Sequence, residues 1–145
     1  MKILVLNGPN INMLGIREPG IYGKQTFADL LALLDKTANE TGVIIDQYQT
    51  NHEGDLVDKI QNSYQKYNGI VINPAAYTHT SVAILDALKS VSIPAVEVHI
   101  SDVDSREAFR QISYAGLACI KTIKGQGLDG YRQAIYYLAE YLNNL

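Results

Sequence analysis

Residues 70–100, IVINPAAYTHTSVAILDALKSVSIPAVEVHI, hold two short apolar runs on either side of a longer segment. The runs are Ile70–Ile72 and Ala95–Ile100, and the segment between them carries apolar residues at helical spacing, at Val82, Leu85 and Leu88. Short continuous apolar runs are typical of parallel strands that helices cover on both faces. The stretch therefore predicts a strand, a helix and a second strand parallel to the first.

The same alternation continues along the rest of the chain. Three further apolar runs are expected to form strands, at Ile3–Leu6, Val43–Tyr48 and Cys119–Ile123. Helical spacing is found from Phe27 to Ala38, at Leu56, Val57, Ile60 and Tyr64, around Ser105–Ile112, and from about Leu128 onward. Thr26 and Asp29 resemble the pair that caps a helix start, and Gly42 is typical of a helix end.

Five strands that alternate with helices predict an α/β fold in a single domain, residues 1–145. With right-handed crossovers we expect a flavodoxin-like, doubly wound five-stranded parallel sheet with strand order 2-1-3-4-5. In that order the first, third and fourth strands are neighbours, and ligands bind beyond their carboxyl ends, where the winding direction changes. Functional residues are therefore expected after these three strands.

The composition excludes several classes of protein. A net charge of -3 offers no positive field for nucleic acid or an anionic membrane, and no apolar run is long enough to span a bilayer or form a signal-peptide core. The single cysteine, Cys119, lies in apolar surroundings and is expected to be a buried structural thiol. We expect a cytoplasmic protein that acts on a small molecule.

Polar side chains follow each of the three strands expected to be neighbours. They are Asn10, Arg17 and Tyr22 after the first, Asn73 and His79 after the third, and Glu97, His99 and Ser101 at the end of the fourth. The loop after the first strand is long, and long loops without regular structure often form lids or binding loops.

Glu97 and His99 are two residues apart on a strand, so their side chains point to the same face. A carboxylate in this position can orient the imidazole and favour its protonated form, which makes His99 a candidate general acid. The alternative is a structural pair, in which the glutamate satisfies a core or edge histidine. The nearby Asn73 and His79 favour a role in function.

Arg17 and Tyr22 form a second candidate pair. A guanidinium near a phenol lowers the pKa of the phenol because it stabilises the phenolate, so Tyr22 can serve as a base. The alternative is a tyrosine that only packs on the surface. Gly20 and Gly23 lie on either side of Tyr22 and suit a lid that closes over a substrate.

Charged residues farther along the chain allow two interpretations each. Arg106 and Arg110, four residues apart in an expected helix, can hold substrate oxygens or form salt bridges with Glu107. Asp86 interrupts the apolar face of its helix, and it either faces solvent or meets the site of a neighbouring subunit.

Two further patterns are weak indicators of function. Gly125, Gly127 and Gly130 match the spacing of a dinucleotide-binding loop, but they follow the last strand, so we expect only a turn into the final helix. The three histidines lack a metal-binding spacing, so no metal is expected.

Three segments match a known family in order and position. They are LNGPNINMLGIREPGIYG at residues 6–23, INPAAYTHTSVAILDAL at 72–88 and EVHISDVDSREAFRQIS at 97–113. Together with the chain length they resemble the type II 3-dehydroquinate dehydratase family over essentially the whole chain. The resemblance implies a cytosolic flavodoxin-like enzyme without metal or cofactor. Such an enzyme removes water from 3-dehydroquinate to give 3-dehydroshikimate, in aromatic amino acid biosynthesis or quinate breakdown.

The resemblance also implies roles for single residues. Tyr22 corresponds to the base that removes the proton beside the ketone, and Arg17 supports its ionised form. Asn10 helps to hold a water that stabilises the enolate, while His99, oriented by Glu97, protonates the departing hydroxyl. A base and an acid on different loops can act on opposite faces of one ring, as an anti elimination requires.

Substrate contacts and assembly follow from the same resemblance. The substrate carboxylate is expected on the Ile100–Ser101 turn, the ring hydroxyls near Asn73, His79, Asp86 and Arg110, and Arg106 against the closed lid. Asp102 stands where asparagine is expected, and its negative charge is expected to weaken binding slightly. A homododecamer of four trimers is implied, which would give Asp86 and the tyrosine-rich last helix a partner surface.

Other functions are possible on this fold. A flavin-binding electron carrier would need a phosphate loop rich in serine, threonine or glycine after the first strand, where this chain has Asn7-Gly8-Pro9-Asn10. A phosphorylation receiver would need an acidic cluster there and an aspartate in place of Asn73. A catalytically silent scaffold subunit would have no need of Tyr22, Arg17 and His99.

Overall fold

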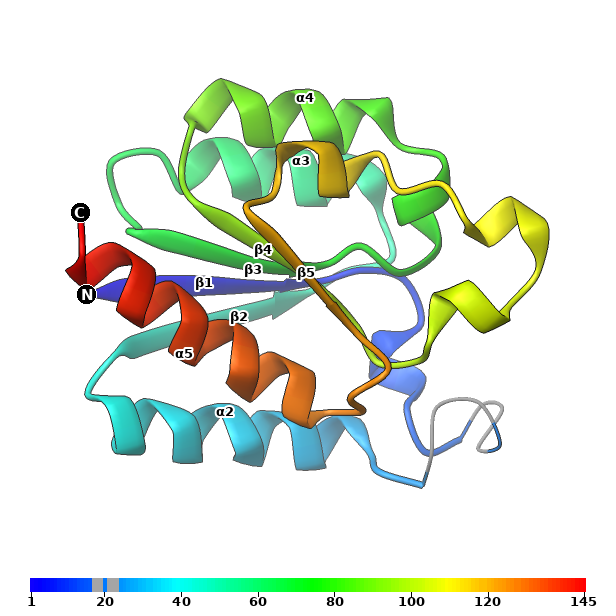
Figure 1. Cartoon of the computed structure of the whole chain (residues 1–145), viewed down its shortest axis with the longest axis horizontal. Coiled ribbons are helices and arrows are strands. Elements are labelled where there is room, and N and C mark those ends of the chain that lie inside the picture. Colours follow the sequence, from blue (N-terminus) through cyan, green and yellow to red (C-terminus); the bar gives the residue numbers. More distant parts are fainter. Residues whose placement is uncertain (17–19, 21–23) are drawn as a thin grey trace.

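The computed structural model describes residues 1–16, 20 and 24–145. Its centre is a sheet of five parallel strands in the order β2-β1-β3-β4-β5 (Figure 1). The strands are β1 (Lys2–Asn7), β2 (Ile44–Gln49), β3 (Gly69–Asn73), β4 (Ala95–His99) and β5 (Lys121–Lys124). The predicted flavodoxin-like sheet and its strand order are therefore confirmed.

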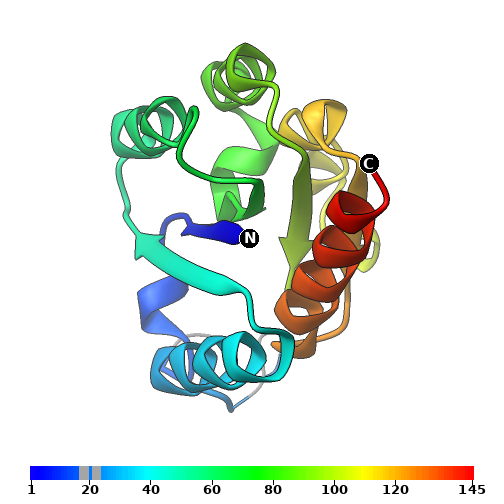
Figure 2. The same ribbon diagram turned by 90° about the vertical axis from the view of Figure 1, so that its left-hand side faces the viewer.

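Helices cover both faces of this sheet. In Figure 1, α3 (Glu53–Asn62) and α4 (Val82–Val91) lie above the strands, and α2 (Phe27–Thr41) and α5 (Asp129–Asn143) lie below them. Figure 2, turned by 90°, shows the same three layers from one end. The layers explain why the strands read as continuous apolar runs, since both of their faces are buried.

The core consists of two apolar clusters, one on each side of the sheet. Ile3 and Val5 of β1 pack toward α2 and α5, while Leu4 and Leu6 of the same strand pack toward α3 and α4. Successive side chains on a strand point to opposite faces, so one short run supplies both clusters.

The start and end of α2 follow the predicted signals. The Thr26 side chain accepts from the Asp29 N–H at 3.1 Å, and the Asp29 carboxylate accepts from the Thr26 N–H at 2.8 Å. At the other end Gly42 has a φ of 73°, a left-handed conformation that glycine adopts readily. The predicted capping pair and helix stop are therefore confirmed.

The helix expected around Ser105–Ile112 does not form. Two short 3₁₀ helices, Val103–Ser105 and Ala108–Arg110, occupy the segment, and Arg106 between them is extended, with a ψ of -172°. The Gln111 side chain donates to the carbonyls of Val103, Arg106 and Glu107. These carbonyls are thereby partly satisfied by a side chain, which competes with the backbone pattern of an α-helix.

In two other helices, one residue of the predicted apolar face is exposed to solvent. Tyr64 lies beyond the end of α3 and is 56% exposed, because the chain turns at Gln65, which has a φ of 62°. Val82 begins α4 but is 49% exposed, and the buried face of that helix is made by Ile84, Leu85, Ala87, Leu88 and Val91.

Alanine at Gly8 should destabilise the protein, whereas alanine at Gly54 should not. A Cβ at Gly8, directly after β1, would lie 2.4 Å from the backbone oxygen of Pro74, so the ends of two neighbouring strands would have to separate. We expect a loss of about 1–3 kcal/mol in the free energy of unfolding.

Gly54, in the first turn of α3, is the matched control. Apart from Gly54 itself, its chain neighbours and the backbone of its own helix, nothing lies within 4 Å of its Cβ position. Alanine there should therefore leave stability unchanged or raise it by up to about 1 kcal/mol. Chemical denaturation of both variants would measure the difference, and equal stabilities would contradict the packing argument.

Candidate active site

A hollow of about 200 Å³ lies beyond the carboxyl ends of β1, β3 and β4. The predicted site residues that line it are Asn10, Asn73, His79, His99, Ile100, Ser101, Arg106 and Arg110. Pro9, Ile11, Ala75, Ala76 and Val103 complete its wall. The structure thus brings together polar residues that are far apart in the sequence, at the edge where the fold predicts a ligand.

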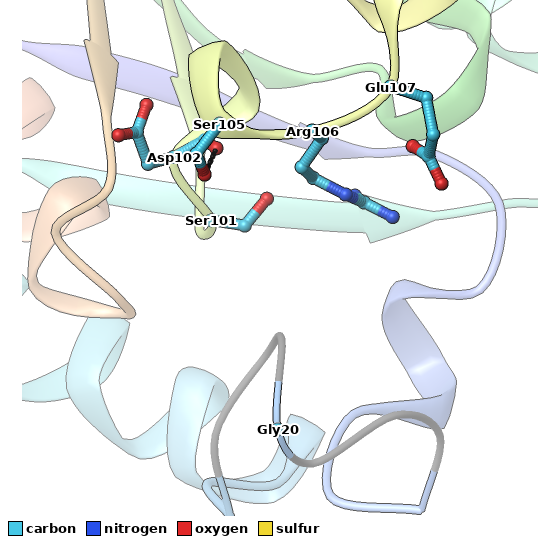
Figure 3. Close-up of a pocket in the computed structure, with 6 residues that line it drawn as sticks. All are labelled: Gly20, Ser101, Asp102, Ser105, Arg106 and Glu107. Atoms are coloured by element: carbon cyan, nitrogen blue, oxygen red, sulfur yellow. Dashed lines mark hydrogen bonds between the residues drawn. The ribbon is translucent and has the colours of Figure 1, made fainter.

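A second hollow, of about 470 Å³, shares Ser101 and Arg106 with the first. Figure 3 shows Ser101 and Arg106 on one side of it and Gly20 on the opposite side. The Asp102 side chain accepts from the Asp104 N–H at 3.1 Å and so caps a 3₁₀ helix. The carboxylate at this position therefore has a local structural partner.

Glu97 and His99 lie side by side on β4, as predicted. His99 Nε2 is 3.1 Å from Glu97 Oε1, and the residues are 5% and 1% exposed. An ionised carboxylate only accepts hydrogen bonds, so Nε2 carries the hydrogen of this contact. Nδ1 is then the ring nitrogen that can exchange a proton with a ligand in the hollow.

Two hydroxyl groups complete the surroundings of the Glu97 carboxylate. Ser113 Oγ donates to Oε2 at 2.5 Å, and Thr122 Oγ1 donates to Oε1 at 3.2 Å. Burial alone would raise the pKa of Glu97, but the hydrogen bonds from His99, Ser113 and Thr122 and the electrostatic attraction of His99 outweigh it. The pKa of Glu97 therefore lies below its usual value. The carboxylate is ionised at neutral pH and holds the imidazole in one orientation.

A buried tyrosine links the ends of β1 and β3. Tyr131 of α5 donates from its hydroxyl to Asn7 Oδ1 at 2.6 Å and accepts from Asn73 Nδ2 at 2.9 Å. Asn7 and Asn73 are register partners on adjacent strands. Tyr131 falls in the last helix that the sequence predicts, and no local signal marks its hydroxyl as a support for Asn73.

Asn10 is fixed by contacts with the loop after β2. Its N–H donates to Asn51 Oδ1 at 3.1 Å, and Gln49 Nε2 donates to the same oxygen at 3.2 Å and to Gly8 O at 3.1 Å. Asn10 has a φ of 69°, a left-handed conformation that asparagine tolerates better than most residues. The described part of the long loop after β1 is therefore ordered at its start.

His79 is held by a backbone carbonyl from a distant segment. Its Nδ1 lies 2.8 Å from the carbonyl oxygen of Ile112. A carbonyl only accepts, so Nδ1 carries the hydrogen and Nε2 is the nitrogen that can contact a ligand. The sequence predicted His79 as a site residue but gave no indication of this partner.

The Ile100–Ser101 turn is oriented by the glycine pattern after β5. Gly125 N–H donates to the carbonyl oxygens of His99 and Ser101, and Gly127 N–H donates to that of Ile100. In a planar trans peptide the N–H points opposite to the C=O. The N–H groups of Ile100 and Ser101 therefore point away from the glycine turn. The pattern forms the expected turn into α5, with both glycines at positive φ.

The salt bridge considered for Arg110 forms, and its role in holding substrate oxygens stays a prediction. Arg110 Nε is 2.6 Å from Glu107 Oε2, which is the salt bridge considered from the sequence, yet Arg110 also lines the smaller hollow. Arg106 lines both hollows. Arg110 belongs to the 3₁₀ helix Ala108–Arg110, and Arg106 is the extended residue between the two 3₁₀ helices, so neither lies on the predicted α-helix.

Some predicted residues are not placed in the site. Arg17 and Tyr22 lie outside the described residues. Asp86 is exposed on α4 and lines neither hollow. Cys119 is half-buried rather than fully buried, and burial together with the charge of Glu97 raises its pKa to about 12, so it is a neutral thiol at physiological pH.

The described residues form neither a metal-binding cluster nor a membrane-spanning helix. Within residues 1–16, 20 and 24–145, no three histidine, cysteine, aspartate or glutamate side chains are close enough to hold a metal ion together. In the same part of the chain, no helix has the length and apolar character needed to cross a membrane.

The strand order and the polar hollow define a doubly wound α/β protein with a buried carboxylate–imidazole pair beside a small-molecule site. The family model of class II dehydroquinases matches residues 1–139. A 3-dehydroquinate dehydratase of Endomicrobium trichonymphae is 56% identical over 92% of this chain and 94% of its own length. The chain therefore belongs to the class II dehydroquinase family.

Solved structures agree with this assignment. The crystal structure of type II dehydroquinase from Butyrivibrio crossotus matches with a TM-score of 0.93 and 52% identity, covering 95% of this chain and 97% of that one. The type II dehydroquinase from Propionibacterium acnes matches with a TM-score of 0.91 and 43% identity, over 96% of each chain.

Acid should remove stability that the Glu97 carboxylate provides. Because the pKa of Glu97 is lowered by folding, its contribution is complete above the usual value of 4.5 and is lost as the pH falls through the folded value. The Tm of the wild type should therefore fall more steeply below pH 4.5 than that of Glu97→Gln.

Calorimetry across this pH range would measure both proteins, with the exposed Glu140→Gln as a control that keeps the wild-type slope. Parallel curves for the wild type and Glu97→Gln would contradict a lowered pKa.

Proposed function

We propose that this protein dehydrates 3-dehydroquinate to 3-dehydroshikimate, in the shikimate pathway to aromatic amino acids or in quinate breakdown. Membership of the class II dehydroquinase family and the names of its relatives support the reaction. The observation that carries the proposal is the Glu97–His99 pair, buried at the wall of a small polar hollow. Such a pair can deliver a proton to a departing hydroxyl group.

His99 serves as the general acid. Glu97 holds Nε2, so an imidazolium has its second proton on Nδ1, the nitrogen available to the hollow. As the carbon–oxygen bond of the substrate breaks, that proton passes to the oxygen and water leaves. The ionised carboxylate stabilises the imidazolium before the transfer and keeps the ring in position.

Tyr22 serves as the base, with Arg17 supporting its phenolate; both assignments rest on the family motif at residues 6–23. Tyr22 takes the proton beside the ketone and leaves an enolate. Asn10, which lines the hollow on the β1 side, helps to hold a water that stabilises the enolate oxygen. Tyr22 follows β1 in the sequence, whereas His99 ends β4. Base and acid then come from different parts of the fold and can act on opposite faces of the ring, as an anti elimination requires.

The remaining lining residues bind the substrate. The N–H groups of Ile100 and Ser101 are directed away from the Gly125–Gly127 turn, an orientation that suits a substrate carboxylate. Asn73, His79 and Arg110 are hydrogen-bonding partners for ring hydroxyls, and Arg106 contacts the closed lid. No metal or cofactor is needed, because every proposed step is a proton transfer or the departure of water.

None of the three alternatives from the sequence is favoured, and Asn73 in place of an aspartate already disfavours a phosphorylation receiver. The comparisons give no support to a flavin-binding electron carrier, since the matching family and relatives are dehydroquinases. A silent scaffold subunit would not require a desolvated carboxylate–imidazole pair at the hollow.

Purified protein should convert 3-dehydroquinate to the conjugated enone 3-dehydroshikimate, measured by ultraviolet absorbance, with the same rate when a chelator is present. Tyr22→Phe and His99→Ala should each lower kcat by at least about 10²–10⁴-fold, because each removes one proton-transfer group. Circular dichroism should show both variants folded.

His52→Ala is the matched control, because His52 is exposed at the start of α3 and away from the hollow. Full activity in either Tyr22→Phe or His99→Ala would refute the assigned role, and an inactive wild type would refute the reaction.

We also propose a cytoplasmic homododecamer built as four trimers. Exposed apolar residues lie near Asp86: Val82 is one turn away on the same face of α4, and Leu117, which is 71% exposed, lies on the 3₁₀ helix that packs against α4. Asp86 would then reach the hollow of a neighbouring subunit and contact a ring hydroxyl.

Analytical ultracentrifugation should show a species of twelve chains at micromolar concentration. Asp86→Ala should lower kcat/KM by roughly tenfold, the loss of one hydrogen bond to a charged group, without changing the fold of the protomer. A fully active monomer would contradict both the assembly and this role of Asp86.

A further inference from the structure

We propose that the segment of residues 112–114 (the 112–114 segment) positions both histidines of the hollow. Within this proposal, Ser113 and Thr122 act on His99 by fixing the Glu97 carboxylate. The inference rests on the proposed function, since it concerns the acid of that reaction. Ser113 and Thr122 do not line the hollow and touch no reacting atom, so they are positioning residues.

The Ser113 hydroxyl is oriented before it meets Glu97. The Gly116 N–H donates to Ser113 Oγ at 3.0 Å, and the hydroxyl hydrogen is thereby left to point at Glu97 Oε2, 2.5 Å away. A hydrogen bond from a neutral donor to a carboxylate is stronger than one between neutral groups. Ser113 therefore fixes one of the two oxygens of Glu97.

Thr122 fixes the other oxygen from the next strand. Glu97 and Thr122 are register partners on β4 and β5, so their side chains stand on the same face of the sheet. Thr122 Oγ1 lies 3.2 Å from Oε1, the oxygen that also contacts His99 Nε2. Because both oxygens accept a hydrogen bond, the orientation of the carboxylate plane is fixed. The carboxylate in turn orients the imidazole ring of His99 through the contact with Nε2.

Gly116 makes room for this arrangement. A Cβ at Gly116 would lie 2.8 Å from Ser113 Oγ and 3.3 Å and 3.4 Å from the two carboxylate oxygens of Glu97. Glycine is required at Gly116 by this close approach, since it allows the backbone to pass directly over the carboxylate.

The neighbours of Ser113 in the chain reach the other histidine. The Ile112 carbonyl contacts His79 Nδ1 at 2.8 Å, and the Tyr114 N–H donates to the Thr78 carbonyl at 2.9 Å. Three consecutive residues thus bind Glu97 on β4 and the 3₁₀ helix Ala75–His79. The segment sets the spacing between the acid and a substrate-binding histidine.

Two titratable groups, His99 and Cys119, face Glu97, and the hydroxyl donors act on its pKa in addition to them. His99 lies on the same strand, and Cys119, after the 3₁₀ helix Ala115–Ala118, is a neutral thiol because burial raises its pKa to about 12. Loss of a hydroxyl donor should therefore raise the pKa of Glu97 and shift the acid limb of the activity profile to higher pH.

Kinetics of hydroxyl deletions test the proposal. Ser113→Ala should lower kcat roughly tenfold with KM changed less than about twofold, and should move the acid limb of kcat to higher pH. Thr122→Val should show a smaller loss, and Thr122→Ser should recover most of it. Thr41→Val removes a hydroxyl at the end of α2, far from the hollow, and should keep wild-type kinetics.

A stability measurement separates this proposal from the proposed function. Ser113→Ala should lower the Tm of the wild type, but lower that of Glu97→Gln by less than about half as much, because the charged acceptor is already gone. This coupling is measurable even when 3-dehydroquinate is not turned over, in which case only the proposed function fails.

Two results would overturn the positioning role. One is a wild-type kcat and pH profile in Ser113→Ala. The other is an equal fall in Tm in the wild-type and Glu97→Gln backgrounds, which would show that Ser113 stabilises the fold without acting on the Glu97 carboxylate.

Discussion

The carboxyl edge of the sheet depends on one desolvated negative charge. Glu97 is 1% exposed, and a carboxylate removed from water at this depth requires donors that replace its hydration. Its donors come from β4, β5 and the irregular segment between them. One electrostatic requirement, donors for the buried Glu97 carboxylate, is therefore met jointly by the position of β5, the course of that segment and the orientation of His99.

The parallel sheet concentrates this chemistry at one place. Carboxyl ends of parallel strands lie at the same edge, so residues at or just after the ends of β1, β3 and β4 meet, although His99 comes 89 positions after Asn10. The buried network of Asn7, Asn73 and Tyr131 ties two of these strand ends to α5. The edge is thus a rigid support on which loops carry the functional groups.

Much of this arrangement is encoded in local sequence pattern. Apolar runs predicted the strands, and right-handed crossovers in a doubly wound sheet predicted their order. The positions of Glu97 and His99 on one strand face predicted their contact. The predicted strand order makes β4 and β5 neighbours, but it does not determine the register that pairs Thr122 with Glu97.

The parts that pattern did not predict depend on tertiary contacts of irregular backbone. A helix was expected around Ser105–Ile112, yet the chain forms two 3₁₀ helices there, and the Gln111 side chain donates to three carbonyls of residues 103–107. Ser113 and the Ile112 carbonyl reach the site from such irregular backbone. Without the periodicity of a helix or strand, the sequence does not predict the direction in which these groups point.

The position of Tyr131 late in the chain affects when the binding edge can form during synthesis. Asn7 leaves the ribosome early, but the hydroxyl that it accepts from is 124 residues later in the chain. Until that helix emerges and docks, two strand ends carry amides with no aromatic hydroxyl between them, and contacts of such long sequence separation form late in folding. A nascent chain can therefore assemble the first strands well before it can present a finished binding edge.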